Sequence, residues 1–386
     1  MPRLAEVVAA LERRYDPAWA EPWDAVGLVC GDPEAPVRRV LLAVDPVAAV
    51  AEEARAWGAD LLVTHHPLFL RPVHGVPATT AKGRVLHRLL TGGVALYVAH
   101  TNADVADPGV SDALAAALDV EVTGPLAARP GEARDKLVTF VPQAAAERLV
   151  DALADAGAGV IGDYTRCAWT ATGVGTFRPG SAARPVLGRV GEVAEVPETR
   201  VEMVLPRARR AAVLAALRAV HPYEEPAYDV YPLADEPGPR GTGRVGRLAR
   251  PEPLGAFADR VARALPATGH GVRVAGDLQR EVRTVAVCGG AGDGLLDAAA
   301  AAGVDAYLTA DLRHHPASEA LEQAGVAGGP ALVDAAHWAT EWPWLADCAR
   351  GLVDALGGDP AGSGATVETR VSTTVTDPWT ARRSAP

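Results

Sequence analysis

Short, almost wholly apolar runs alternate with amphipathic segments along the first third of the chain. The runs ADLLV (59–63) and GVALYVA (93–99) show no alternation of polar and apolar side chains, which is typical of strands buried on both faces. Segments 46–57 and 80–90 instead carry apolar residues at helical spacing. This arrangement predicts an α/β fold in which helices cover a largely parallel sheet.

The pattern is interrupted in the middle of the chain. Segments 125–135 and 234–243 are rich in Ala, Pro, Gly and charged residues, as linkers are. Between them the chain reads strand–helix–strand–strand–helix–strand with one extra strand, which predicts a ferredoxin-like α+β domain. We therefore expect an inserted domain at 129–239 between the two halves of a parent domain, 1–128 and 240–386. The five strands expected in the insert are 136–141, 164–172, 188–196, 200–205 and 227–233.

Composition excludes several classes of protein. The 37 basic and 48 acidic residues give a net charge of −11, which disfavours general binding to nucleic-acid backbones. No run of 18 uncharged apolar residues occurs, and the N-terminus lacks the basic and apolar regions of a secretory signal. The four cysteines are far apart, so neither a disulfide framework nor a thiolate zinc site is expected. We expect a cytoplasmic protein without a membrane partner.

Two adjacent histidines, His65 and His66, follow the first of these apolar runs and precede Pro67. Adjacent residues within a strand point to opposite faces, but at a strand end both imidazoles can turn toward one cavity. Neutral imidazole binds iron, zinc, cobalt and nickel. The pair therefore indicates a metal site, and the alternative is two solvated loop histidines.

Two other pairs each combine a histidine with a carboxylate four residues later in the sequence. His100 and Asp104 follow the second apolar run and can converge on one ion, although Asp104 or Asn102 could instead close the turn. His337 and Glu341 share one face of an expected helix and can hold a metal together. The alternative for that pair is an ordinary hydrogen bond within the helix.

The three pairs together offer nitrogen and oxygen ligands and no thiolate. Six side chains are available: His65, His66, His100, Asp104, His337 and Glu341. Six ligands exceed the four that a tetrahedral zinc ion needs. They suit two divalent ions about 3.5–4 Å apart with Glu341 bridging them. Fe, Zn, Mn and Co all accept such ligands, so the pattern does not select the metal.

Three other segments bear on function or order. Asp311 and His315 follow another expected strand and could orient a metal-bound imidazole, whereas Asp311 could equally cap a helix. The run GGAGDG (289–294) could bind a phosphate through its backbone amides or form a tight turn. At the C-terminus we expect a last strand at 365–375 and a frayed tail at 376–386.

Six motifs carry a family resemblance. They are WDAVGLVCGDP (23–33), VTHHPLF (63–69), HTNADVADPGVSD (100–112), GRVG (243–246), TADLRHH (309–315) and HWATEWPWL (337–345). As a set, over nearly the whole chain, they resemble the GTP cyclohydrolase I type 2 homologue family, also called Nif-three-like. Longer bacterial members carry a PII/CutA-like inserted domain, which matches 136–233.

The resemblance implies a Nif-three-like core with a dinuclear metal centre, so two divalent ions per chain are expected. Five residues match the family's ligands: His65, His66, Asp104, His337 and Glu341. His100 is then a sixth ligand or an outer partner. The family also implies a toroidal homohexamer whose metal centres face an inner cavity.

Two functions remain open on this basis. The first is a metal-dependent hydrolase that acts on a nucleotide or another phosphorylated small molecule. If the family name describes the reaction, water attacks the purine C8 of GTP, formate is released and the imidazole ring opens, with Asp311 or His315 as the proton carrier. The second is a non-catalytic metal-binding scaffold, regulator or metal-delivery protein.

Overall fold

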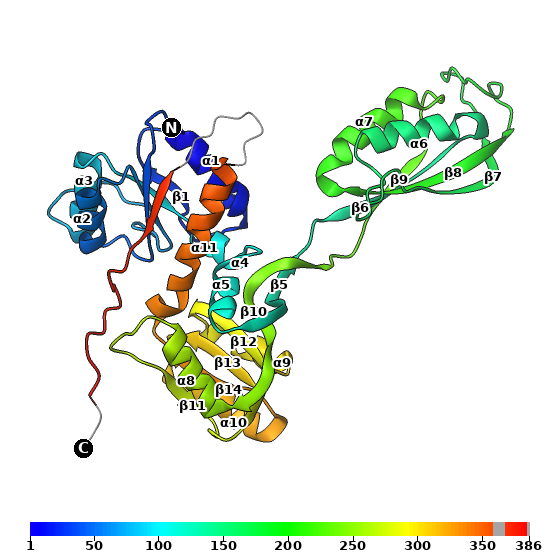
Figure 1. Ribbon diagram of the computed structural model, residues 1–386. Helices are drawn as coiled ribbons and strands as arrows, with labels where there is room; N and C mark the ends of the chain where they lie inside the picture. The colour runs from blue at the N-terminus through cyan, green and yellow to red at the C-terminus, as the bar shows by residue number, and fades with distance from the viewer. Residues whose placement is uncertain (358–366, 384–386) are drawn as a thin grey trace. The chain divides into compact units, whose positions relative to one another are not determined.

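The computed structural model describes residues 1–357 and 367–383. The chain forms two compact units, Met1–Arg129 with Pro239–Pro386, and Pro130–Gly238 (Figure 1). The first two residues of the expected strand 365–375 and the last three of the chain lie outside the described residues. No described helix is both long and apolar enough to cross a membrane.

The first sheet of the larger unit has the parallel centre that the apolar runs predicted. Strands β15, β2, β3 and β4 are parallel and adjacent in that order, and β1 pairs antiparallel with β4 at the edge. Helices α2 and α3 pack on this sheet through a buried apolar cluster. The elements are β1 (Gly27–Cys30), β2 (Arg39–Ala43), β3 (Leu61–Thr64), β4 (Ala95–Val98), β15 (Glu368–Val371), α2 (Ala48–Trp57) and α3 (Ala81–Thr91).

The second sheet of the larger unit has six strands in the order β11-β14-β13-β12-β10-β5. Its centre, β12, β13 and β14, is parallel, while β11 and β10 pair antiparallel with β14 and β12. The strands are β5 (Val120–Pro130), β10 (Pro237–Pro253), β11 (Arg273–Ala275), β12 (Glu281–Ala291), β13 (Ala306–Ala310) and β14 (Ala331–Ala335). The helices that follow them in sequence are α8 (Leu254–Ala264), α9 (Leu296–Ala301) and α10 (His314–Ala327).

One hydrophobic core joins the two sheets. It contains Leu42 and Val63 from the first sheet, Leu308 and Val333 from the second, and Leu345 from the long helix between them. Figure 1 shows that helix, α11, running from one sheet toward the other. The helices that contribute to this core include α1 (Leu4–Arg14), α5 (Val110–Ala117) and α11 (His337–Gly357). The shared core holds the two halves of the parent sequence in one unit.

The smaller unit is the inserted domain, and it has the ferredoxin-like order of elements. Its strands pair antiparallel in the order β7-β8-β6-β9, and α6 and α7 share a core with the sheet. The elements are β6 (Arg134–Pro142), α6 (Ala146–Asp155), β7 (Trp169–Phe177), β8 (Ala194–Pro206), α7 (Arg210–Val220) and β9 (Tyr228–Pro232). The prediction of an extra strand was wrong, because residues 194–196 of the expected strand 188–196 and all of 200–205 belong to one continuous strand, β8.

The chain passes from one unit to the other within each of the two expected linkers, but much of each linker is strand. Most of 125–135 lies in β5 and β6, and 234–243 leads into β10, which is the neighbour of β5 in the second sheet. Gly241 permits the two backbones to approach, since a Cβ atom there would lie 2.3 Å from the Ala127 carbonyl oxygen. Small and flexible residues predicted loops, whereas pairing between distant segments made them strands.

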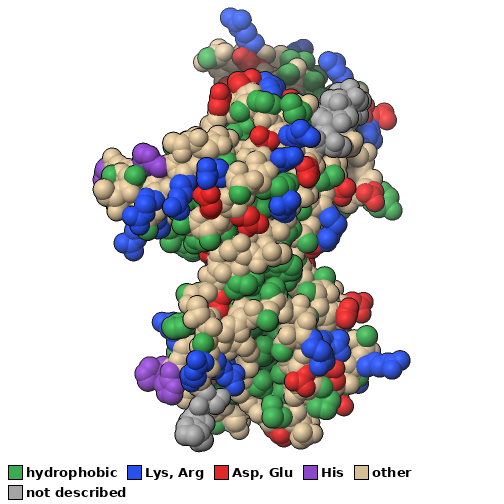
Figure 2. All heavy atoms as spheres, turned by 60° about the vertical axis from the view of Figure 1, so that its left-hand side comes forward, with side chains coloured by type: hydrophobic (Ala, Val, Ile, Leu, Met, Phe, Trp, Pro, Cys, Tyr) green, Lys and Arg blue, Asp and Glu red, His purple; other side chains and the backbone are tan. Residues whose placement is uncertain are grey.

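Surface charge is mixed on the face drawn in Figure 2. Basic and acidic side chains are interspersed there among apolar and neutral ones.

Asp135 provides a test of the insert's packing. Its carboxylate is fully buried and accepts hydrogen bonds from Arg207 Nε at 3.1 Å and Arg210 Nε at 2.7 Å. The Arg210 hydrogen bond, reinforced by Arg207, holds the pKa of Asp135 below its usual range. The folded insert is therefore stabilised by the ionised form, and this stabilisation is lost as pH falls through the lowered pKa.

We predict that Asp135→Asn lowers the free energy of unfolding of the insert at pH 7 by about 2 kcal/mol, because hydrogen bonds to a charged group are lost. The difference from the unmodified protein should shrink below about pH 4, where Asp protonates in the unfolded chain. Amide hydrogen exchange of β6 and β8 measures this locally. Asp155→Asn, at an exposed position on α6, is the matched control. Equal protection in the two variants at pH 7 would contradict the role given to Asp135.

Candidate metal centre

His65 and His66 lie at the carboxyl end of β3, where backbone pairing with β2 continues. The His65 amide donates to the Ala43 carbonyl at 3.2 Å, and the His66 amide donates to the Val44 carbonyl at 2.9 Å. The His65 ring is fully buried, and its Nδ1 lies 2.9 Å from the Ala99 carbonyl oxygen. Because a carbonyl only accepts, Nδ1 carries the proton and Nε2 is left with a lone pair.

His100 and Asp104 are positioned by the short helix α4 (Thr101–Val105), which begins directly after β4. The His100 amide donates to Asn102 Oδ1 at 2.9 Å, so Asn102 closes the turn. Asp104 Oδ1 lies 3.6 Å from His65 Nε2, and the His65 and His100 ring centres are 5.2 Å apart. Asp104 therefore faces the histidines.

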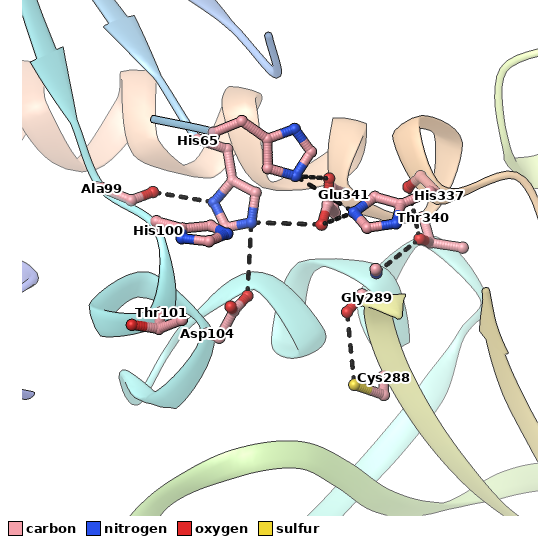
Figure 3. A network of polar contacts seen from close by, with 12 residues as sticks. His65, Ala99, His100, Thr101, Asp104, Cys288, Gly289, His337, Thr340 and Glu341 are labelled. Carbon is pink, nitrogen blue, oxygen red and sulfur yellow. Dashed lines mark hydrogen bonds and ion pairs between the residues drawn. The ribbon is translucent and has the colours of Figure 1, made fainter. Parts of the chain in front are cut away.

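His337 and Glu341 lie at the start of α11. His337 Nε2 is 2.9 Å from Glu341 Oε1, which is the helical contact expected of an isolated pair. The same carboxylate is only 3% exposed, and its oxygens lie 3.4 Å from His65 Nε2 and 3.2 Å from His66 Nε2. Figure 3 shows Glu341 between His65 and His337. A local hydrogen bond alone does not account for this convergence.

The converging atoms fit a divalent metal ion. Buried His65 Nε2 and Glu341 Oε2 have no hydrogen-bond partner among the described residues. Buried acceptors without a partner cost free energy, and a cation between them would satisfy their lone pairs. Two overlapping groups have all their ligand atoms within 4.8 Å of one another: His65, His66 and His100, and His66, His337 and Glu341.

The cysteine beside the cluster in Figure 3 does not belong to the donor set. Burial raises the pKa of Cys288 to about 12, so its thiol remains protonated at neutral pH. Its Sγ donates to the Gly289 carbonyl at 3.4 Å. The donors are thus imidazole nitrogens and carboxylate oxygens, which suit Fe, Mn, Co and Zn.

Three outer carboxylates hold three of the imidazoles by their Nδ1 atoms. His66 Nδ1 is 2.7 Å from Asp45 Oδ1, and His100 Nδ1 is 2.8 Å from Asp24 Oδ1. His337 Nδ1 is 2.7 Å from Asp311 Oδ2. Such contacts fix the orientation of a ring and direct the lone pair of Nε2 toward the metal. Of these three, the sequence predicted only the one made by Asp311.

The sequence only weakly indicates that Asp24 and Asp45 contact the histidines. Asp24 lies in the motif WDAVGL, and Asp45 follows the apolar run that became β2. Their partners are 76 and 21 residues away in sequence. The contacts became visible only when the fold brought these segments together.

The cluster is strongly coupled electrostatically. Burial alone would raise the pKa of Glu341, but the facing imidazoles of His66, His337 and His65 outweigh it and hold the pKa well below its usual range. Burial alone would lower the pKa values of His66 and His337, but Glu341 and the outer carboxylates raise them to about 10 and about 11. The site thus stabilises positive charge around Glu341.

Of Asp311 and His315, only Asp311 contacts the cluster among the described residues. Asp311 follows β13 with a backbone φ of 56°, which is uncommon for a residue other than glycine and is often found at functional sites. It does not cap α10, whose N-cap is Arg313. His315 is exposed on α10 beside His314, with ring centres 5.1 Å apart. No contact between His315 and the cluster is present among the described residues.

The glycine-rich run 289–294 lies against the cluster. Its first three residues continue β12, so it is not the simple turn between strand and helix that was expected. Gly290 has a φ of 71°, and a Cβ atom there would lie 2.4 Å from Glu341 Oε1 and 3.2 Å from His337 Nε2. Its amide donates to Thr340 Oγ1 at 2.9 Å. The missing side chain leaves room for the carboxylate.

Comparison with known proteins agrees with this fold. The sequence model of the Duf34/NIF3 (NGG1p interacting factor 3) family matches residues 2–378. A Mycobacterium tuberculosis protein named GTP cyclohydrolase 1 type 2 homolog is 50% identical over 98% of this chain and 96% of its own length. A Bacillus subtilis protein of the same name is 38% identical over 86% of this chain and 88% of its own.

Solved structures give the same result. A Bacillus cereus protein described as related to NIF3 is 36% identical, covers 98% of both chains and superposes with a TM-score of 0.73. A Staphylococcus aureus protein with 24% identity covers 98% of both chains and has a TM-score of 0.78, which supports the fold alone. The chain belongs to the Duf34/NIF3 family, whose curated members include the GTP cyclohydrolase 1 type 2 homologs.

Proposed function

We propose that the protein is a hydrolase that uses two divalent metal ions held at this cluster. The observation that carries the proposal is the buried carboxylate of Glu341. It faces imidazoles from both halves of the parent sequence, and its Oε2 accepts no hydrogen bond from the described residues. The proposed ligands are His65, His66, His100, Asp104, His337 and Glu341. Both groups of converging ligand atoms contain His66, which supports two neighbouring positions.

The chain's own residues have distinct tasks in this proposal. Glu341 supplies negative charge at the centre, and the three outer aspartates keep the imidazoles oriented. Bound divalent ions would supply an activated water at neutral pH and polarise the group under attack. Asp311 is the better candidate for moving a proton, because its side chain is 57% exposed while one oxygen contacts His337. His315 makes no described contact with the cluster.

The substrate we propose is a nucleotide, following the name of the relatives. Protein purified without added metal, then loaded with Fe, Mn, Co or Zn, should convert GTP with release of formate if the family name describes the reaction. Formate and the ring-opened product can be measured together. Intact GTP beside tightly bound metal would contradict the hydrolase and favour the metal-binding scaffold or delivery role.

Glu341→Gln tests the central ligand. The substitution keeps the shape of the side chain but removes the negative charge that offsets two divalent cations at close range. We predict a fall from two ions per chain to one or none, measured by elemental analysis of folded protein. Glu322→Gln, at an exposed position on α10, should keep the full metal content. Full double occupancy in Glu341→Gln would exclude a bridging role.

Gly290→Ala tests the space around Glu341. The new Cβ atom would meet Glu341 Oε1 at 2.4 Å on a backbone that already has a positive φ. We predict that metal affinity falls by about 10- to 100-fold, as is typical when the surroundings of metal ligands are altered. Competition with a chromophoric chelator measures the change. Gly294→Ala, in the same run but with nothing within 4 Å of its Cβ position, is the control. Equal affinities in the two variants would contradict the packing argument.

A further inference from the structure

The segment that follows β15 is held against the larger unit by side-chain hydrogen bonds. The expected strand 365–375 ends at Val371, and the frayed tail was expected only from residue 376. Ser372 Oγ and Thr374 Oγ1 donate to the same Glu53 oxygen at 2.6 and 2.9 Å. Farther along, Thr376 Oγ1 donates to Asp45 Oδ2. We refer to residues 372–379 as the C-terminal strap. These long-range hydrogen bonds hold the strap in place, including Thr376, where fraying was expected to begin.

The strap is attached to the metal centre through one carboxylate. Asp45 uses Oδ2 to accept from Thr376 and Oδ1 to contact His66 Nδ1 at 2.7 Å. The far end of the strap passes over Gly269, where a Cβ atom would lie 2.4 Å from the Trp379 carbonyl oxygen. The path of the strap is therefore defined at both ends.

A cavity of about 250 Å³ lies between the strap and the metal centre. Its lining includes two proposed ligands, His66 and His337, and the strap residues Asp377 and Trp379. This volume is below the 300–1,000 Å³ usual for drug-sized ligands, so it fits one ring system and not a whole large molecule. A group bound there would lie beside the metal ligands.

Asp377 is the unexplained group in this cavity. It is 9% exposed, and its Oδ2 is buried without a hydrogen-bond partner among the described residues. The carboxylates of Asp45 and Asp311 are already used to hold histidines. A buried acceptor without a donor costs free energy, which a ligand with an N–H group would recover.

Trp379 supplies a second recognition element. The residue is 66% exposed, although it is two residues from a buried carboxylate and lines the same cavity. Flat aromatic side chains bind planar rings by offset stacking. One carboxylate residue and one aromatic residue of the strap thus line the same small space.

We propose that this cavity binds the ring of the substrate, and that the ring is a planar nitrogen heterocycle with an N–H donor for Asp377 and a face for Trp379. The inference rests on the proposed function, because it places the reacting atom beside the metal ligands His66 and His337. It adds the place where the ring of that substrate binds and two recognition residues that lie outside the metal centre.

Two ring-matched probes test the proposal in the full-length, metal-loaded protein: 2-aminopurine riboside and purine riboside. They differ by one amino group, and stacking quenches the fluorescence of 2-aminopurine. We predict that the unmodified protein prefers 2-aminopurine riboside to purine riboside. Asp377→Ala should weaken the binding of 2-aminopurine riboside by about 10- to 100-fold, so that this variant no longer prefers it. Trp379→Ala should weaken both probes and reduce the quenching. Asp155→Ala and Trp169→Ala, at exposed positions of the insert, are the matched controls.

A second variant tests the position of the strap without changing a recognition residue. Gly269→Ala should displace residues 379–381 and weaken 2-aminopurine riboside, since its Cβ would lie within 2.8 Å of three of their backbone atoms. Gly325→Ala, with nothing within 4 Å of its Cβ position, should bind normally. Elemental analysis of every sample separates the two claims. Absence of metal contradicts the proposed function. Metal-loaded protein that binds neither probe, or binds both equally, overturns the recognition role of the strap. Unchanged probe binding in Asp377→Ala would overturn it as well.

Discussion

The buried carboxylate of Glu341 is the constraint on which the rest of the site depends. A carboxylate at 3% exposure is costly unless positive charge surrounds it, and here imidazoles from the end of β3 and from α11 do so. Neighbouring residues make room for this carboxylate and orient the imidazoles around it. Gly290 leaves the room that the carboxylate occupies, and Asp45 and Asp311 hold two of the imidazoles in position.

The fold explains how His66 and His337, which are 271 residues apart in sequence, meet at this carboxylate. Parallel strands of both sheets end near α11, and ligands in open α/β sheets bind at the carboxyl ends of strands. The first sheet contributes two histidines directly after β3 and His100 after β4, and the second sheet leads into α11 directly after β14. The insert is a unit with its own core, and all six proposed ligands lie outside it.

Sequence reasoning succeeded where the signal was local. Apolar runs predicted the parallel strands, and the histidines at a strand end and the His–Glu pair one helical turn apart indicated the residues that converge. It failed where distant segments decide the outcome. The pairing of β5 with β10 placed much of the expected linkers in strands, and the hydrogen bond from Thr376 to Asp45 holds the start of the expected frayed tail. Asp24 was missed because its contact to His100 spans 76 residues.

The central claim is that a pair of divalent ions is bound around Glu341. Its most direct test is anomalous X-ray diffraction from crystals of protein purified without added metal or chelating resin, with data collected on both sides of the absorption edge of each candidate metal. The account predicts two anomalous peaks per chain, one on each side of the Glu341 carboxylate and both within coordination distance of the proposed imidazoles. Protein whose metal lies elsewhere, or whose Glu341 contacts only histidines and water in fully metal-loaded crystals, would contradict it.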